Sequence, residues 1–294
     1  MAPRHRVLAT VLLALACPAF PEAPATAPAR PTSTQSQQLM NTPRPLFFSD
    51  LVALDTAQHR KLTLPAQRRS FAFAASAHML PLTVSEVGAA VPHYPIVFVE
   101  EGETLVLVAL TGLPNAGNRF IDSKGEWRAG AYIPAYVRGY PFIAVRPNKE
   151  AEPVIAFDPN AADFKAKDGV PLIAPDGQAG EQLKGILAFH GEYQSALERT
   201  RQMTQALKRE GVLEEGSLNI QAPDGSTSHI GGFLVLNETK LQALPAEALK
   251  RLMEADAIGI AYAHLLSMGN LGHLLAEAPV NNPSRRPSGK KTGE

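Results

Sequence analysis

Short apolar runs typical of strands fill the first half of this 294-residue chain, and helical periodicity dominates the second half. Residues 96–99 and 105–110 are two such runs. The segment between them, 100–103, is acidic and contains a glycine, so the three together predict an antiparallel hairpin. Residues 142–145 and 154–157 predict a second pair of short strands. The pattern therefore predicts antiparallel pairing in this half of the chain.

The clearest helix covers residues 181–209, where apolar positions recur with a helical period. Gly211 provides a stop signal directly after it. The periodic apolar positions are Leu183, Ile186, Leu187, Tyr193, Leu197 and Leu207. We therefore expect one long helix whose apolar side lies against a sheet.

The last third of the chain is expected to be mainly helical. Strand-like residues 217–221 and 232–236 come first, and Asn237 then caps a helix-rich region that extends to about residue 275. Pro245 interrupts this region near its start. Because strands are grouped before helices, the order predicts an α+β fold. We expect an antiparallel sheet of three or four strands, with the long helix and the C-terminal helical region packed on it.

The first residues have the features of an export signal. Arg4 and Arg6 precede the apolar run 7–16, so residues 1–17 follow the order of a secretory signal. The run has about half of the roughly 20 apolar residues that span a bilayer, which favours a signal over a transmembrane anchor. Cys17, the only cysteine of the chain, is then the candidate lipidation site of a lipoprotein.

The remaining chain divides by composition into three parts. Residues 18–45 are rich in proline and alanine and predict an unfolded linker, residues 46–278 predict one globular domain, and residues 279–294 predict a disordered polar tail. A second interpretation starts translation at Met40, which removes the signal. The sequence thus predicts export to the periplasm or cell surface, with a cytoplasmic location as the alternative.

Composition narrows the classes of partner. The chain is 45% hydrophobic and 19% charged, with a formal net charge of +0. The apolar content supplies a core, and the balanced charge lacks the basic footprint of a nucleic-acid-binding protein. We therefore expect no nucleic-acid partner, and contact with a membrane only through an N-terminal anchor.

Residues 93–142 hold the single tryptophan and four of the six tyrosines. This aromatic block predicts a structured core, with a binding groove as the alternative. The candidate binding residues are His93, Tyr94, Asn118, Asp122, Trp127, Tyr132, Tyr136, Arg138 and Tyr140, together with His264 further along the chain. We expect Trp127 to be buried. We expect Arg138 either to pair with a carboxylate, first of all that of Asp122, or to face the mouth of a groove formed by Tyr132, Tyr136 and Tyr140. We favour the pairing, because a buried charge usually needs a partner.

Several short segments match, in residue identity and in spacing, the sequence motifs of one bacterial family. The central ones read HYPIVF at 93–98, ALTG at 109–112 and YIPAYVRGYPF at 132–142. The flanking ones read PLFF at 45–48 and YAHLLS at 262–267. Over about residues 45–278 the chain thereby resembles the SapC family. The resemblance implies an association with bacterial surface layers and implies no known reaction.

The leading hypothesis that combines these features is a non-catalytic envelope protein. Its N-terminus would tether it, and its aromatic block would bind a polysaccharide, a peptide or a surface-layer protein. The alternative is a cytoplasmic accessory or modifying protein of an uptake or secretion locus, with enzymatic activity of unknown chemistry. That alternative requires His93, Asp122, Arg138 and His264 to converge on one pocket.

The motifs of the common catalytic and cofactor sites are not found in the sequence. His190 and Glu192, with His264 downstream, superficially match the two-histidine, one-carboxylate ligand set of iron sites. However, residues two apart on a helix point in different directions and do not easily hold one metal. We therefore expect no metal and no cofactor.

Overall fold

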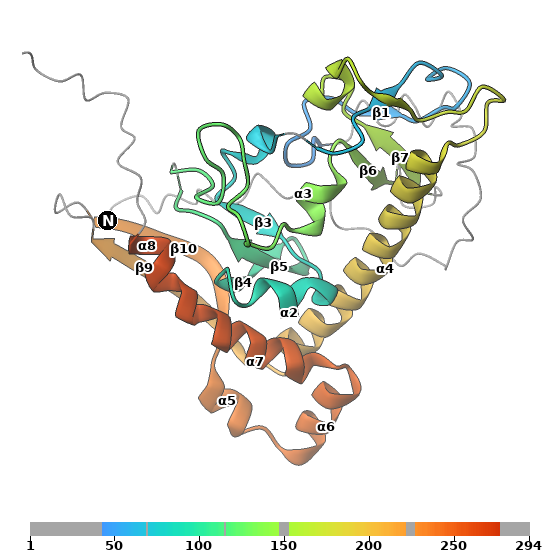
Figure 1. Cartoon of the computed structure of the whole chain (residues 1–294). Coiled ribbons are helices and arrows are strands. Elements are labelled where there is room, and N and C mark those ends of the chain that lie inside the picture. Colours follow the sequence, from blue (N-terminus) through green and yellow to red (C-terminus); the bar gives the residue numbers. More distant parts are fainter. Residues whose placement is uncertain (1–42, 69, 115, 147–152, 222–226, 277–294) are drawn as a thin grey trace, which may run out of the picture.

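The computed structural model describes residues 43–68, 70–114, 116–146, 153–221 and 227–276 (Figure 1). The predicted signal with Cys17, the alternative start at Met40, linker residues 18–42 and the predicted tail lie outside the described residues. The described chain combines antiparallel sheets with a long helix and a helical C-terminal region. This arrangement confirms the predicted α+β class.

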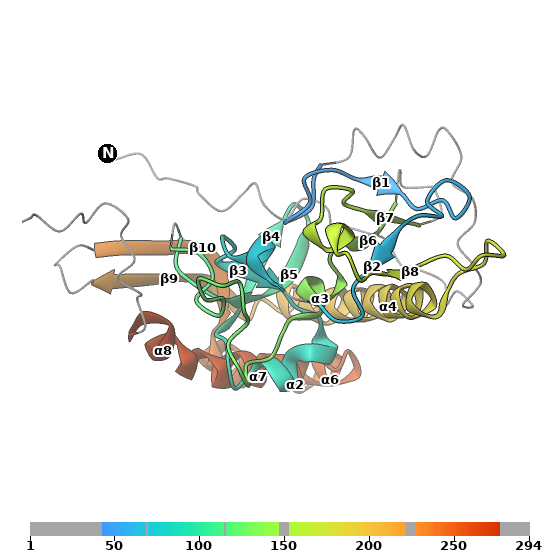
Figure 2. The ribbon, with the colours of Figure 1, turned by 45° about the horizontal axis from the view of Figure 1, so that its top comes forward.

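Five antiparallel strands form the main sheet in the order β3-β5-β4-β10-β9. They are β3 (Met79–Pro81), β4 (Ile96–Glu101), β5 (Thr104–Leu110), β9 (Leu213–Gln221) and β10 (Thr227–Leu236). The predicted β4–β5 hairpin is confirmed, and Gly102 at its turn adopts a φ of 60°, which favours glycine. Figure 2 shows the β9–β10 hairpin extending away from the rest of the molecule.

The prediction of a single sheet with three or four strands is wrong, because the strands divide between separate sheets. The predicted pair β6 (Phe142–Val145) and β7 (Val154–Phe157) forms, but β1 (Val52–Ala53) joins it at the β7 edge to make a second sheet. A third, two-stranded ribbon pairs β2 (Thr63–Leu64) with β8 (Val170–Pro171). The second sheet has its own apolar cluster, to which Ile143 and Val145 contribute.

Helix α4 (Glu181–Arg209) has the predicted bounds and connects the two larger sheets. At 29 residues it is about 44 Å long. The Gln194 side chain donates a hydrogen bond to the carbonyl of Ala144 in the second sheet at 3.4 Å. One turn from the end of the helix, Thr204 Oγ1 donates to the carbonyl of Leu105 in the main sheet at 2.7 Å. Figure 1 shows this helix running past both sheets.

The remaining helices are short. Before α4 they are η1 (Ala72–Ala74), η2 (Val84–Glu86), α2 (Val87–Ala90), α3 (Ala135–Gly139) and η3 (Ala162–Lys165). The C-terminal region consists of α5 (Glu238–Gln242), α6 (Ala246–Glu254), α7 (Ala257–Ser267), η4 (Met268–Asn270) and α8 (Leu271–Ala276). Asn237 caps α5 as predicted, since its side chain accepts a hydrogen bond from the Lys240 N–H. Within the described residues, no helix combines the length and hydropathy needed to cross a membrane.

Side chains of α7 complete the sheet where β4 and β10 diverge. Only Leu234 and Phe98 pair directly between these two strands. Beyond them, His264 Nε2 accepts from the Leu236 N–H at 3.1 Å, and Nδ1 donates to the Ile96 carbonyl at 2.6 Å. Ser267 Oγ accepts from the Ile96 N–H at 2.9 Å. These side chains therefore replace part of the strand-to-strand ladder.

Candidate functional site

Glu86 precedes the aromatic block in sequence, and its carboxylate, which is 4% exposed, accepts hydrogen bonds from residues of that block. It accepts hydrogen bonds from the Thr83 N–H and hydroxyl, both at 2.9 Å, and from the Tyr132 hydroxyl at 3.1 Å. The N–H of Ala135, at the start of α3, donates to it at 2.5 Å. Burial and the Glu86 charge both raise the pKa of Tyr132. Glu86 thus fixes Tyr132 and α3 relative to η2.

Arg138 lies at the surface above this network and does not pair with Asp122, so that prediction is wrong. Its Nε donates to the Ile133 carbonyl at 3.1 Å, and its Nη2 donates to the Tyr132 hydroxyl at 3.3 Å. The guanidinium carbon is 5.9 Å from the centre of the Tyr132 ring and 5.3 Å from that of Phe189. We call Tyr132, Arg138 and Phe189 the guanidinium platform.

Asp122 forms its hydrogen bonds within its own turn. One of its carboxylate oxygens accepts from the backbone N–H groups of Lys124 and Glu126, both at 2.9 Å. Gly125 in the same turn has a φ of 80°, and a Cβ there would meet the Ser70 hydroxyl at 2.3 Å. The turn is therefore a closed local unit with Asp122 as its acceptor.

Most other aromatic candidates belong to the core. Trp127 is 9% exposed and packs edge-on against Phe71, with ring centres 5.5 Å apart, so the prediction of burial is confirmed. The hydroxyl of Tyr94, a fully buried residue, donates to the Tyr132 carbonyl. Tyr136 is also buried, and its hydroxyl donates to the Leu46 carbonyl at 2.9 Å. Burial raises the pKa of Tyr94 and of Tyr136 well above the ordinary value.

Tyr140 is also buried, in contact with the N-terminal part of the domain. Its ring stacks on Phe73 with centres 4.2 Å apart, and its hydroxyl donates to a carboxylate oxygen of Asp158 at 3.4 Å. Burial, and then the charge of Asp158, raise the pKa of Tyr140 to about 12. The guanidinium carbon of Arg68 is 5.0 Å from the Phe73 ring centre, and Arg68 forms an ion pair with Asp163 at 3.6 Å. Tyr140 therefore serves the packing between the N-terminal segment and the rest.

The candidates His93, Asn118 and His264 lie in separate places. His264 is buried at the junction of β4 and β10, and burial lowers its pKa. Asn118 accepts from the Phe120 N–H at 2.9 Å within its own loop. His93 is half-buried beside Tyr94, with ring centres 6.0 Å apart. No interaction found among the described residues joins His93, Asp122, Arg138 and His264, so the arrangement on which the enzyme hypothesis depended is not formed.

The histidine and glutamate of α4 also point to different environments. His190 is 3% exposed and lies against Gly139 of α3, where an added Cβ would meet its ring at 3.0 Å. Burial lowers the pKa of His190 to about 4, and the Gly139 backbone opposes this shift. Glu192 is exposed. Within the part of the chain that the structure describes, no three His, Cys, Asp or Glu side chains are grouped to hold a metal ion.

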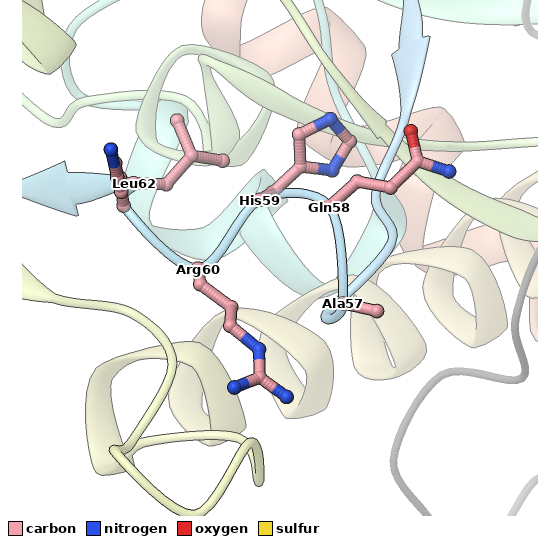
Figure 3. A pocket seen from close by; sticks show the side chains of 6 residues that line it. Ala57, Gln58, His59, Arg60 and Leu62 are labelled. Atoms are coloured by element: carbon pink, nitrogen blue, oxygen red, sulfur yellow. The ribbon is translucent and has the colours of Figure 1, made fainter.

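A pocket of about 460 Å³ lies at the turn formed by residues 57–62 (Figure 3). His59 Nδ1 accepts from the Asp55 N–H at 2.9 Å, so this ring is part of the turn itself. Figure 3 shows the His59 and Arg60 side chains leaving the turn in different directions. The pocket therefore does not gather several polar groups around one position, as ligand sites usually do.

The sequence reasoning missed Glu86, Arg68 and Phe189. A signal for Glu86 was present, because Thr83 followed three residues later by Glu86 is the pattern of a capping box, and the structure contains that box. The roles of Arg68 and Phe189 depend on contacts with residues outside their own sequence segments, so no local sequence pattern predicts them.

Comparison with known proteins gives one result. The model of the SapC family matches residues 54–274, which is most of the chain and nearly all of the described fold. No curated protein matches the chain, and no solved structure does.

Proposed function

Because the chain belongs to the SapC family, we propose that it is an exported envelope protein with a non-catalytic binding role. Its partner is a surface polymer with acidic groups, in the first place a polysaccharide, and a peptide or surface-layer protein would present the same groups. Arg4, Arg6, the apolar run 7–16 and Cys17 support export and tethering. The guanidinium platform supports the binding role.

The single observation that carries the binding role is the state of Arg138. It is the only one of the ten candidate residues that combines an exposed side chain with a fixed position between two aromatic rings. Its two hydrogen bonds go to a neutral carbonyl and a neutral hydroxyl, and no ion pair of Arg138 is found among the described residues. A guanidinium has five N–H donors, so several remain for a carboxylate or phosphate.

Binding to the insoluble envelope fraction of the source cells tests this role. We expect Arg138→Ala to weaken binding by about tenfold or more, as loss of an anchoring charge usually does. Arg138→Lys keeps the charge but loses the planar fork, so it should retain only part of the binding. Arg209→Ala, at an exposed arginine in the last turn of α4, is the matched control. If a folded Arg138→Ala variant binds as well as the wild type, the guanidinium platform is not the binding site.

The compartment is tested separately at the N-terminus. Mass spectrometry of the mature protein is expected to show a chain that lacks residues 1–16 and carries a lipid on Cys17. Labelled palmitate should be incorporated into the wild-type chain, and Cys17→Ser should abolish the label. An intact chain that starts at Met40 in the soluble cytoplasmic fraction would refute both export and tether.

A further inference from the structure

The outer side of α7 is apolar and carries no charge. From Ala257 to Ala276, through α7, η4 and α8, the sequence contains no Asp, Glu, Lys or Arg. Two large apolar side chains are nevertheless exposed on α7, Leu266 at 73% and Tyr262 at 44%. Figures 1 and 2 show α7 on the outside of the molecule. An uncharged helix surface of this length is typical of an interface.

The exposed residues share one side of the helix. Gly259, Tyr262, Leu266 and Gly269 are all exposed, and their spacings of three, four and three keep them within about a quarter of the helix circumference. The opposite side faces the sheet, where His264 and Ser267 bond to β4 and β10. The hydrogen bonds of His264 and Ser267 therefore fix the orientation of α7, and with it the position of its exposed side.

The four exposed positions have a two-fold pattern. Gly259 and Gly269 lie five residues on either side of position 264, and Tyr262 and Leu266 lie two residues on either side. If two copies of α7 cross antiparallel at this midpoint, each Tyr262 lies opposite Leu266 of the second copy. Each Gly259 then lies opposite Gly269 of the second copy, where the missing side chains allow close approach. The pattern is therefore self-complementary, as a two-fold interface requires.

We propose that this surface, which we call the α7 face, is the contact of a two-fold homodimer. Two identical charged surfaces would repel each other. The α7 face contains no charged residue, so two copies of it do not repel. Centred on position 264, the uncharged stretches of the two copies overlap from 257 to 271, which is about 22 Å, and a helix pair of this length buries less than about 1,000 Å², below the usual range of specific interfaces. We therefore expect a weak dimer, with a dissociation constant in the micromolar range.

Other occupants fit the surface less well. Helices that lie on membranes usually flank their apolar side with Lys and Arg, and the α7 face has neither. A charged partner segment would find no opposite charge on it. A second copy needs only the apolar contacts and the pattern that the face already contains.

Sedimentation equilibrium of the full chain, as isolated, tests the proposal. We expect a concentration-dependent monomer–dimer equilibrium, and we expect Leu266→Glu and Tyr262→Glu each to raise the dissociation constant by about tenfold or more. Met253→Glu is the matched control, because Met253 is 68% exposed on α6 and outside the α7 face. A wild-type chain that stays monomeric up to about 500 µM, far above the expected dissociation constant, overturns the proposal. So does an equal effect of the control variant.

Disulfide trapping tests the two-fold geometry. In a Cys17→Ser background, a Tyr262→Cys chain mixed with a Leu266→Cys chain is expected to form mixed disulfide faster than either chain forms disulfide with itself. Equal rates would contradict the antiparallel arrangement. Binding of a monomeric wild-type chain to phosphatidylglycerol vesicles, lost in Leu266→Glu, would show that the face contacts lipid and would also overturn the dimer.

Discussion

Replacing Glu86 tests whether its carboxylate, in addition to the apolar core, holds α3 in place. Donors from Thr83, Tyr132 and Ala135 converge on it at 2.5 to 3.1 Å. In Glu86→Ala, the backbone N–H groups of Thr83 and Ala135 remain without their acceptor. Each buried donor that loses its acceptor costs about 1–3 kcal/mol. Two such groups, with the loss of bonds to a charged acceptor, predict a destabilisation of about 3–5 kcal/mol.

Urea unfolding followed by circular dichroism measures this cost. We expect the midpoint to fall with little change in slope, because the native surface is otherwise retained. A loss of 3–5 kcal/mol is a large share of the roughly 5–15 kcal/mol that stabilises a typical domain. Glu86→Gln keeps the shape but not the charge and should lie between wild type and Glu86→Ala. Glu192→Ala, at an exposed carboxylate on α4, is the control and should stay within about 0.5 kcal/mol of wild type.

The reasoning about Glu86 would fail on one clear result. If Glu86→Ala costs less than about 1 kcal/mol, its donors find water or other acceptors and the carboxylate does not organise the site. A cost of the expected size in Glu86→Ala with none in Glu192→Ala supports the network.

Three further predictions concern the core and its buried titratable groups. Trp127→Ala should lower the free energy of unfolding by about 3–5 kcal/mol, and an unchanged thermal melting curve would show that the ring is not core. Burial lowers the pKa of His190 to about 4 in the folded protein. As the pH falls, His190 is therefore protonated in the unfolded chain before it is protonated in the folded one, and the free energy of unfolding should decrease by about 3 kcal/mol from pH 7 to pH 4. His190→Leu should flatten that part of the pH profile, and a profile identical to wild type would contradict the assignment. Burial raises the pKa of Glu101 to about 7, so its contribution has the opposite sign and stability is lost as the pH rises through 7. Glu101→Gln should therefore be more stable than wild type at pH 8 in the same urea assay, and lower stability there would contradict this.

Regular patterns in the sequence were sufficient to predict the long elements. The helical period of 181–209 predicted α4 to its observed ends, because a one-sided apolar stripe can be satisfied only by helix packing. The β4–β5 hairpin followed from two apolar runs and a short acidic turn. The second sheet could not be predicted in the same way, because β1 is only two residues long and pairs with β7 about a hundred residues later.

The candidate site was predictable only in part. Aromatic density correctly located a structured block, but the same residues serve either a core or a surface, and burial depends on distant elements. Arg138 was expected to need a carboxylate, and instead Tyr132 and Phe189 surround it while solvent remains accessible. Phe189 lies on α4 and reaches this place only through the tertiary packing of that helix against α3.

The way in which α7 completes the main sheet has a consequence for the order of folding. A chain emerging from the ribosome exposes β10 before His264 and Ser267 have been synthesised. Until then β10 can attach to β4 only through the pair Leu234 and Phe98, and the Ile96 and Leu236 groups lack their partners. The β9–β10 hairpin should therefore dock late, when nearly the whole fold is already made. A chain that ends before residue 264 would expose an unpaired strand edge, and unpaired edges readily pair with strands of other chains and cause aggregation.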